Sequence, residues 1–160
     1  STLNANVYKL HYLTEPLQNT AKLFIKLPKD SVPASKHYIA LRNRKGDWNY
    51  VNTTLYNDSV LQANTKSLGD FTVKVDTIAP EIRPQSRTSS RIILKIIDKH
   101  SGVNRYEGYI NGEWVLFEED FYGRVSYKID KKRLKAKRPY HLEFRVYDNC
   151  GNISEYKLKW

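Results

Sequence analysis

The sequence of 160 residues contains no methionine, a single cysteine and no apolar run long enough to span a membrane. With Cys150 alone, neither an intramolecular disulfide nor a zinc site built on cysteines can form. Its position in a turn-like segment favours a packed thiol over a reactive one. The chain begins at Ser1 without the basic and apolar segments of a signal peptide. We therefore expect a piece of a longer protein whose targeting signal lies outside it.

Catalytic motifs are also missing from the sequence. None of the four histidines has a histidine partner two or four residues away, the spacing typical of metal sites on strands or helices. They are His11, His37, His100 and His141. There is no glycine-rich phosphate loop and no Gly-x-Ser-x-Gly nucleophile elbow. We predict that the chain has no catalytic residue, needs no cofactor and is not an enzyme.

One acidic run could still supply acid–base chemistry. Glu118, Glu119 and Asp120 are consecutive, and a pair of carboxylates can hydrolyse a glycosidic bond. Neighbouring residues on a strand face opposite sides, however, and nothing in the sequence places these three in a cleft. We favour a solvated loop and keep a glycosidase as the alternative.

The chain is strongly basic, with 27 lysines and arginines against 17 acidic residues and a net charge of +10. The densest basic run could bind phosphate or carboxylate groups of a polymer, with an affinity that falls as salt rises. The alternative is a solvated loop. The basic residues of this run are Lys131, Lys132, Arg133, Lys135, Lys137 and Arg138.

Apolar and polar residues alternate through most of the chain, as in Leu142, Phe144 and Val146. Such alternation is typical of strands with one face in a core. The pair Asn111-Gly112 suits a type I′ hairpin. Nearby aromatic residues, among them Trp114 and Phe117, are expected to fill or cover the core. Strands are predicted near residues 7–13, 22–27, 37–43, 48–53, 60–65, 71–75, 91–98, 105–110, 113–117, 124–129, 141–147 and 154–159.

The strand rhythm is interrupted after Val75. Pro80 and Pro84 follow within a few residues, and proline cannot donate a hydrogen bond to a strand ladder. This segment predicts a short, stiff, extended linker. We therefore predict an all-β chain of two tandem immunoglobulin-like β-sandwich domains, residues 1–76 and 77–160.

Two aspartates stand in turn-like segments of the second domain. Asp98 precedes Ser101-Gly102, and Asp148 precedes Gly151-Asn152. An aspartate can accept backbone N–H bonds in such a turn, and glycine tolerates positive φ. The same oxygens could hold calcium. Asp98 and Asp148 therefore have two interpretations, turn residue and calcium ligand.

The second half carries a specific set of motifs: Asp98-x-x-Ser101-Gly102, Ile110-Asn111-Gly112-x-Trp114 and Asp148-Asn149-x-Gly151-Asn152, preceded at 69–77 by Gly-Asp-Phe-Thr-Val-Lys-Val-Asp-Thr. The set resembles the C-terminal, non-catalytic immunoglobulin-like region of bacterial lysostaphin-type zinc metallopeptidases, which are peptidoglycan endopeptidases of the cell envelope. The resemblance covers residues 60–160 well and residues 1–59 loosely. The zinc ligands of that family, a His-x-x-x-Asp pair and a His-x-His pair, are missing here.

The resemblance implies a non-catalytic accessory, spacer or binding module. It implies a covalently linked catalytic domain outside this chain and a place in the cell envelope, periplasmic or at the surface. Peptidoglycan or another anionic glycan is the expected contact, and nucleic acid is not expected. Because similar turns occur in adhesins and glycan-binding modules, the alternative is an adhesin-like or carbohydrate-binding module unrelated to a peptidase.

Overall fold

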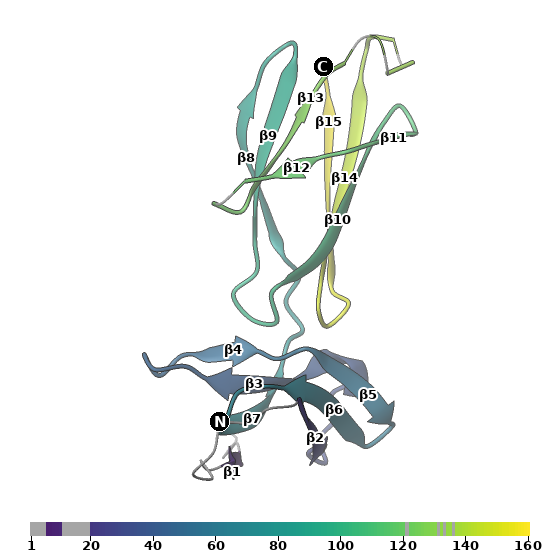
Figure 1. Ribbon diagram of the computed structural model, residues 1–160. Helices are drawn as coiled ribbons and strands as arrows, with labels where there is room; N and C mark the ends of the chain where they lie inside the picture. Colours follow the sequence, from purple (N-terminus) through teal and green to yellow (C-terminus); the bar gives the residue numbers. More distant parts are fainter. Residues whose placement is uncertain (1–5, 11–19, 121, 131, 133, 136) are drawn as a thin grey trace. The chain divides into compact units, whose positions relative to one another are not determined.

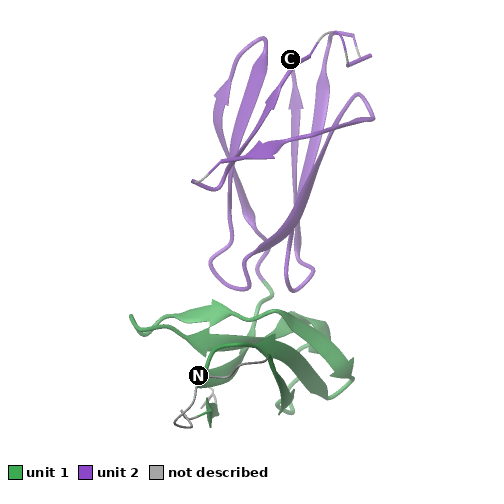
Figure 2. Ribbon diagram, viewed as in Figure 1, with its two compact units in different colours: residues 1–77 green, residues 78–160 purple. Residues whose placement is uncertain are grey.

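The computed structural model describes residues 6–10, 20–120, 122–130, 132, 134–135 and 137–160. Strands dominate, and the chain divides into two compact units, Ser1–Thr77 and Ile78–Trp160 (Figures 1 and 2). The sequence placed the domain boundary after Asp76. No helix among the described residues is long and apolar enough to cross a membrane. The predicted all-β fold of sandwich domains is confirmed.

Unit 1 contains a four-stranded sheet of order β1-β7-β3-β4 and a three-stranded sheet of order β2-β6-β5. A short 3₁₀ helix (Ala34–Lys36) leads into β3. The strands are β1 (Val7–Leu10), β2 (Ala21–Lys26), β3 (His37–Arg42), β4 (Trp48–Tyr50), β5 (Thr53–Asn57), β6 (Val60–Thr65) and β7 (Gly69–Val75).

The core of unit 1 lies between these two sheets. Ile25 and Leu61 of the three-stranded sheet belong to one buried cluster with Ile39 and Phe71 of the other sheet. The alternation in β2 explains this arrangement, because Ile25 is buried while its neighbours on both sides are exposed.

Unit 2 contains two four-stranded sheets, of order β11-β10-β14-β15 and β12-β13-β9-β8. The chain passes from one sheet to the other between β11 and β12. The strands are β8 (Glu81–Arg87), β9 (Arg91–Ile97), β10 (Val103–Ile110), β11 (Glu113–Val115), β12 (Glu118–Glu119), β13 (Arg124–Lys128), β14 (His141–Asp148) and β15 (Ile153–Lys159).

The hairpin between β10 and β11 forms as predicted. Asn111 and Gly112 have φ values of 50° and 81°, and Ile110 pairs with Glu113 on either side of the turn. In the core of unit 2, the ring centroids of Phe117 and Phe144 lie 4.7 Å apart.

The predicted linker is shorter than expected at its C-terminal side. Residues from Glu81 to Arg87 form β8, which pairs with β9 and contains Pro84. A strand tolerates proline where no neighbour needs its N–H. β8 lies at the edge of its sheet, and the register shifts between Pro84 and Ser86. Proline therefore marks an edge strand with a bulge here and not a continued linker.

Candidate functional site

The Asp98 turn closes the end of β9. Oδ1 of Asp98 accepts the backbone N–H of His100 at 2.9 Å and that of Gly102 at 2.8 Å. Gly102 has a φ of +83°, a conformation that side chains rarely adopt. The aspartate thus satisfies two backbone donors that the end of the strand would leave without an acceptor.

The Asp148 turn between β14 and β15 repeats this arrangement. Oδ1 of Asp148 accepts the N–H groups of Cys150 and Asn152, each at 2.8 Å. Its Oδ2 accepts the side-chain amide of Asn152 at 2.7 Å. Asp148 is 1% exposed, so these hydrogen bonds replace water around a buried carboxylate.

The two turns lie side by side. The side-chain amide of Asn149 donates to the carbonyl oxygens of Ser101 at 2.8 Å and Gly102 at 3.2 Å. Asp98 and Asp148 offer oxygens within 4.8 Å of each other, a separation at which two carboxylates could share a cation. The turn interpretation is seen directly in the hydrogen bonds, whereas calcium binding by Asp98 and Asp148 stays a prediction.

Asp76 is the last residue of the first predicted domain, at the point where the strand pattern is interrupted. Its side chain is 1% exposed, and its backbone N–H donates to the carbonyl oxygen of Lys36 at 2.8 Å within unit 1. A buried carboxylate is costly unless it is partnered. In the sequence, the feature that indicated this structural role was an aspartate placed directly after the alternating strand pattern that ends at Val75.

The basic segment, here residues 131–138, is the second candidate site. Lys132, Lys135, Lys137 and Arg138 are exposed, while Lys131 and Arg133 lie outside the described residues. At Lys135 the backbone N–H donates to Oε2 of Glu113 at 3.1 Å. The side chain of Asn111 also donates to the carbonyl oxygen of Lys137 at 3.0 Å.

The acidic run does not form a paired-carboxylate site. Glu118 and Glu119 are adjacent on β12, so their side chains leave the strand on opposite sides. Asp120 accepts the backbone N–H groups of Tyr122 and Arg124 and pairs with the Arg124 guanidinium at 2.6 Å. Burial raises the pKa of Asp120, but these hydrogen bonds outweigh burial and hold that pKa below its usual value. A lowered pKa is unsuited to a general acid.

Two of the histidines, His100 and His141, are exposed, and His11 lies outside the described residues. His37 is 4% exposed. Its Nδ1 lies 3.1 Å from the carbonyl oxygen of Pro33, and its Nε2 lies 3.1 Å from Oδ2 of Asp30. The hydrogen bond from His37 lowers the pKa of Asp30 from its ordinary value of 3.8.

This pair predicts a pH dependence of unit 1. Because the pKa of Asp30 is lower in the folded state, the pair stabilises folding above pH 3.8 and loses this effect as pH falls through the folded-state pKa. We expect Asp30→Asn to reduce the drop in the urea midpoint of unit 1 between about pH 5 and pH 3. An identical drop in the two proteins would show that Asp30 is not the titrating group.

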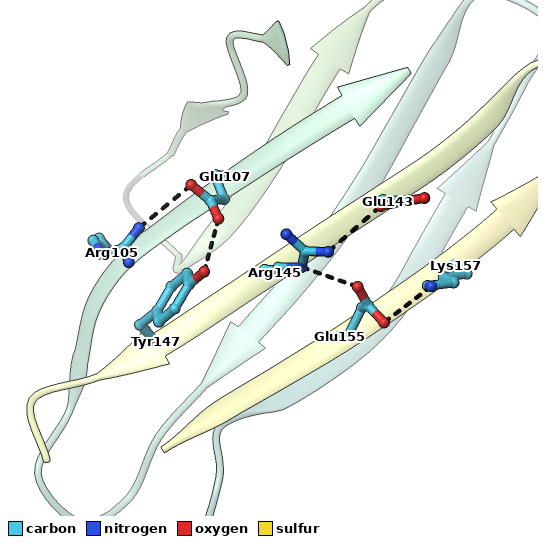
Figure 3. A network of polar contacts seen from close by, with 7 residues as sticks. All are labelled: Arg105, Glu107, Glu143, Arg145, Tyr147, Glu155 and Lys157. Carbon is cyan, nitrogen blue, oxygen red and sulfur yellow. Dashed lines mark hydrogen bonds and ion pairs between the residues drawn. The ribbon is translucent and has the colours of Figure 1, made fainter. Parts of the chain in front are cut away.

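The exposed face of the sheet formed by β10, β14 and β15 carries a polar network (Figure 3). Glu107 pairs with Arg105 at 3.4 Å and accepts the Tyr147 hydroxyl at 2.7 Å. The Arg105 guanidinium lies 3.5 Å from the centre of the Tyr147 ring. Arg105 and Tyr147 are cross-strand neighbours, which explains their contact.

The network has a second part, on β14 and β15 (Figure 3). Arg145 pairs with Glu143 at 3.5 Å and Glu155 at 2.9 Å, and Glu155 also pairs with Lys157 at 3.2 Å. The hydrogen bond from Arg145 lowers the pKa of Glu155. Exposed pairs of this kind contribute little to stability, because water and salt screen them. On this face the charges therefore partner one another.

Comparison with known proteins finds a similarity in the first unit, over just under half of the chain. Residues 1–76 match the Zu5-like domain. None of the curated proteins matches the chain. A solved structure, described as "Structures of Clostridium thermocellum CbhA fibronectin(III)-like modules", is 12% identical, with a TM-score of 0.40, over 88% of this chain and 85% of that chain. This likeness carries no information on activity or ligands.

Proposed function

We propose that the chain is a non-catalytic accessory module that holds a cell-envelope metallopeptidase close to its polymer. The catalytic domain belongs to another part of the parent protein, and peptidoglycan or another anionic glycan is the contact. Two observations support the proposal. The Asp98 and Asp148 motifs, on which the family resemblance depends, form defined turns, and the basic segment presents positive charge on the surface.

The exposed basic segment is the observation that carries the proposed polymer contact. Within the described part of the chain, the side chains of Lys132, Lys135, Lys137 and Arg138 form no ion pair. The backbones of Lys135 and Lys137 are hydrogen-bonded to the side chains of Glu113 and Asn111. Cations on a backbone held at these two points suit a ligand with repeated anionic groups, since less ordering is needed on binding.

The test is sedimentation of the full chain with purified sacculi at low and high salt. We expect retention at about 0.01 M salt that falls at about 0.5 M, because salt screens the exposed charges of the basic segment. The variant Lys135→Glu/Lys137→Glu/Arg138→Glu removes three contacts of about 0.5–1 kcal/mol each, which weakens binding about ten- to hundredfold.

A matched variant separates local contact from overall charge. Lys22→Glu/Lys26→Glu/Lys74→Glu changes the net charge by the same amount at exposed positions of unit 1. We expect this control to retain most of the binding. An equal loss in both variants, or no retention of the unaltered chain at low salt, would contradict the proposed contact.

A further inference from the structure

A groove of ≈ 860 Å³ opens on unit 2, away from the turns of Asp98 and Asp148. One wall is the segment from Glu113 to Glu118, where the chain passes from β11 to β12 and so changes sheet (Figure 1). The other wall is formed by residues 126–130, at the end of β13 and just after it, together with Lys132 and Leu134. The groove thus lies where two segments of the sandwich edge diverge.

The first wall presents apolar side chains to solvent. Trp114 is 58% exposed and Leu116 is 59% exposed, while Val115 and Phe117 between and beside them are buried. Residues two apart on an extended segment share a face, so Trp114 and Leu116 stand together on the open side. The expectation that Trp114 fills or covers the core is wrong, although it is correct for Phe117. Adjacent exposed apolar groups inside a groove are typical of a ligand site.

The polar groups of the groove carry both signs of charge. Glu118 lies on one wall, and Lys128 and Lys132 on the other. Asp130 also lines the groove, with its Oδ1 accepting the backbone N–H of Lys132 at 2.9 Å. A polyanion would meet the carboxylates, so this groove differs from the rest of the basic segment, with which it shares Lys132. Hydroxyl and amide groups, which both donate and accept, fit such a mixed set.

An extended peptide suits the groove less well. Peptides that add to a sheet edge gain affinity from a run of main-chain hydrogen bonds. β11 has three residues and β12 has two, so the edges beside the groove offer few such bonds. The apolar C–H face of an uncharged sugar ring needs no strand edge, because it can stack on the exposed indole.

We propose that this groove binds uncharged pyranose units of a glycan chain, with Trp114 as the stacking platform and Glu118 and Lys128 as partners of hydroxyl and amide groups. The proposal rests on the proposed function in one respect, since it takes the envelope glycan as the polymer. It assigns the sugar rings to the Trp114 groove and the anionic groups to the basic segment.

The test is titration of the full chain with chitohexaose, an uncharged chain of N-acetylglucosamine. NMR resolves the three tryptophan indole N–H groups, from Trp48, Trp114 and Trp160. We expect a saturable shift of the Trp114 signal alone, unchanged at about 0.5 M salt because no ion pair forms. Trp114→Ala is expected to weaken binding about tenfold.

A control variant and a second ligand sharpen the result. Tyr122→Ala removes an aromatic side chain that is 74% exposed in the same unit, and we expect no change in chitohexaose binding. The absence of a Trp114 shift overturns the groove proposal, even if sacculi are retained. A Trp114 shift with the peptidoglycan stem peptide, and none with chitohexaose, also overturns it and assigns the groove to peptides. A Trp114 shift together with retention of sacculi that salt does not reduce supports the groove and removes the basic-segment contact.

Discussion

Replacing Asp148 with alanine is expected to lower the free energy of unfolding of unit 2 by about 3 kcal/mol. The substitution leaves the N–H groups of Cys150 and Asn152 without their acceptor, and the Asn152 side chain loses its partner. Cys150 is 3% exposed, so water cannot fully replace the carboxylate. Denaturant unfolding of the full chain measures the loss, and hydrogen exchange of the β10 and β14 amides assigns it to unit 2.

Two further variants separate the contributions of Asp148 and Asp98 to the free energy of unfolding of unit 2. Asp148→Asn keeps an oxygen for the two backbone donors, and we expect it to recover about half of the loss. Asp98→Ala is expected to cost about 1–2 kcal/mol, because Asp98 accepts the same kind of bonds at a more exposed site. Unchanged midpoints in both alanine variants would show that these turns do not stabilise unit 2.

The same experiment in calcium and in EDTA tests the metal interpretation. Binding to the folded state alone raises the midpoint. If Asp98 and Asp148 are ligands, calcium stabilises the unaltered chain and not Asp148→Asn. A midpoint that calcium does not move leaves these aspartates as turn residues only.

Replacing Gly108 with alanine is the second large change, with an expected loss of about 2–3 kcal/mol in unit 2. A Cβ at this position of β10 would lie 2.5 Å from Cε2 of Phe117 and 3.3 Å from Cδ2 of Phe144. Both rings are buried and contact each other, and Phe117 also packs on Tyr127. Both rings belong to the buried core, so the added Cβ forces either the strand or these rings to shift.

A compensating substitution checks that the clash is the cause. Phe117→Leu removes ring atoms at the point of contact, so Gly108→Ala should cost less in the Phe117→Leu background than in the unaltered chain. Gly112→Ala is the control, since a Cβ there meets nothing within 4 Å and only the positive φ is strained. Additive losses of Gly108→Ala and Phe117→Leu would contradict the steric explanation.

The sequence predicted those strands in which apolar and polar residues alternate clearly, because this pattern fits no other secondary structure. Leu142, Phe144 and Val146 alternate with polar residues and are buried in β14. The pattern failed where it was ambiguous or weak. Pro84 concealed β8, which is possible only at an edge with a bulge. Strand β5 was missed because most of its residues are exposed and no apolar face marks it.

The groove and the surface network depend on pairings that the sequence does not specify. From Trp114 to Phe117 all residues are apolar, so alternation could not tell which side chains face the core. Arg145 has Glu107 opposite it on β10 and Glu155 opposite it on β15. These cross-strand neighbours are known only once the register of three strands is fixed. The Asp98 and Asp148 turns could be predicted from the sequence, because their hydrogen bonds join residues only two or four positions apart.

We propose that the chain contacts the envelope polymer without cleaving it. The most direct measurement incubates the full chain with purified sacculi, then assays the pellet for bound chain and the supernatant by chromatography for soluble glycan and peptide fragments. We expect salt-sensitive retention of the chain in the pellet and no fragments in the supernatant above the level of the buffer control. Release of fragments that Glu118→Gln or Glu119→Gln abolishes would contradict it and identify the acidic run as catalytic.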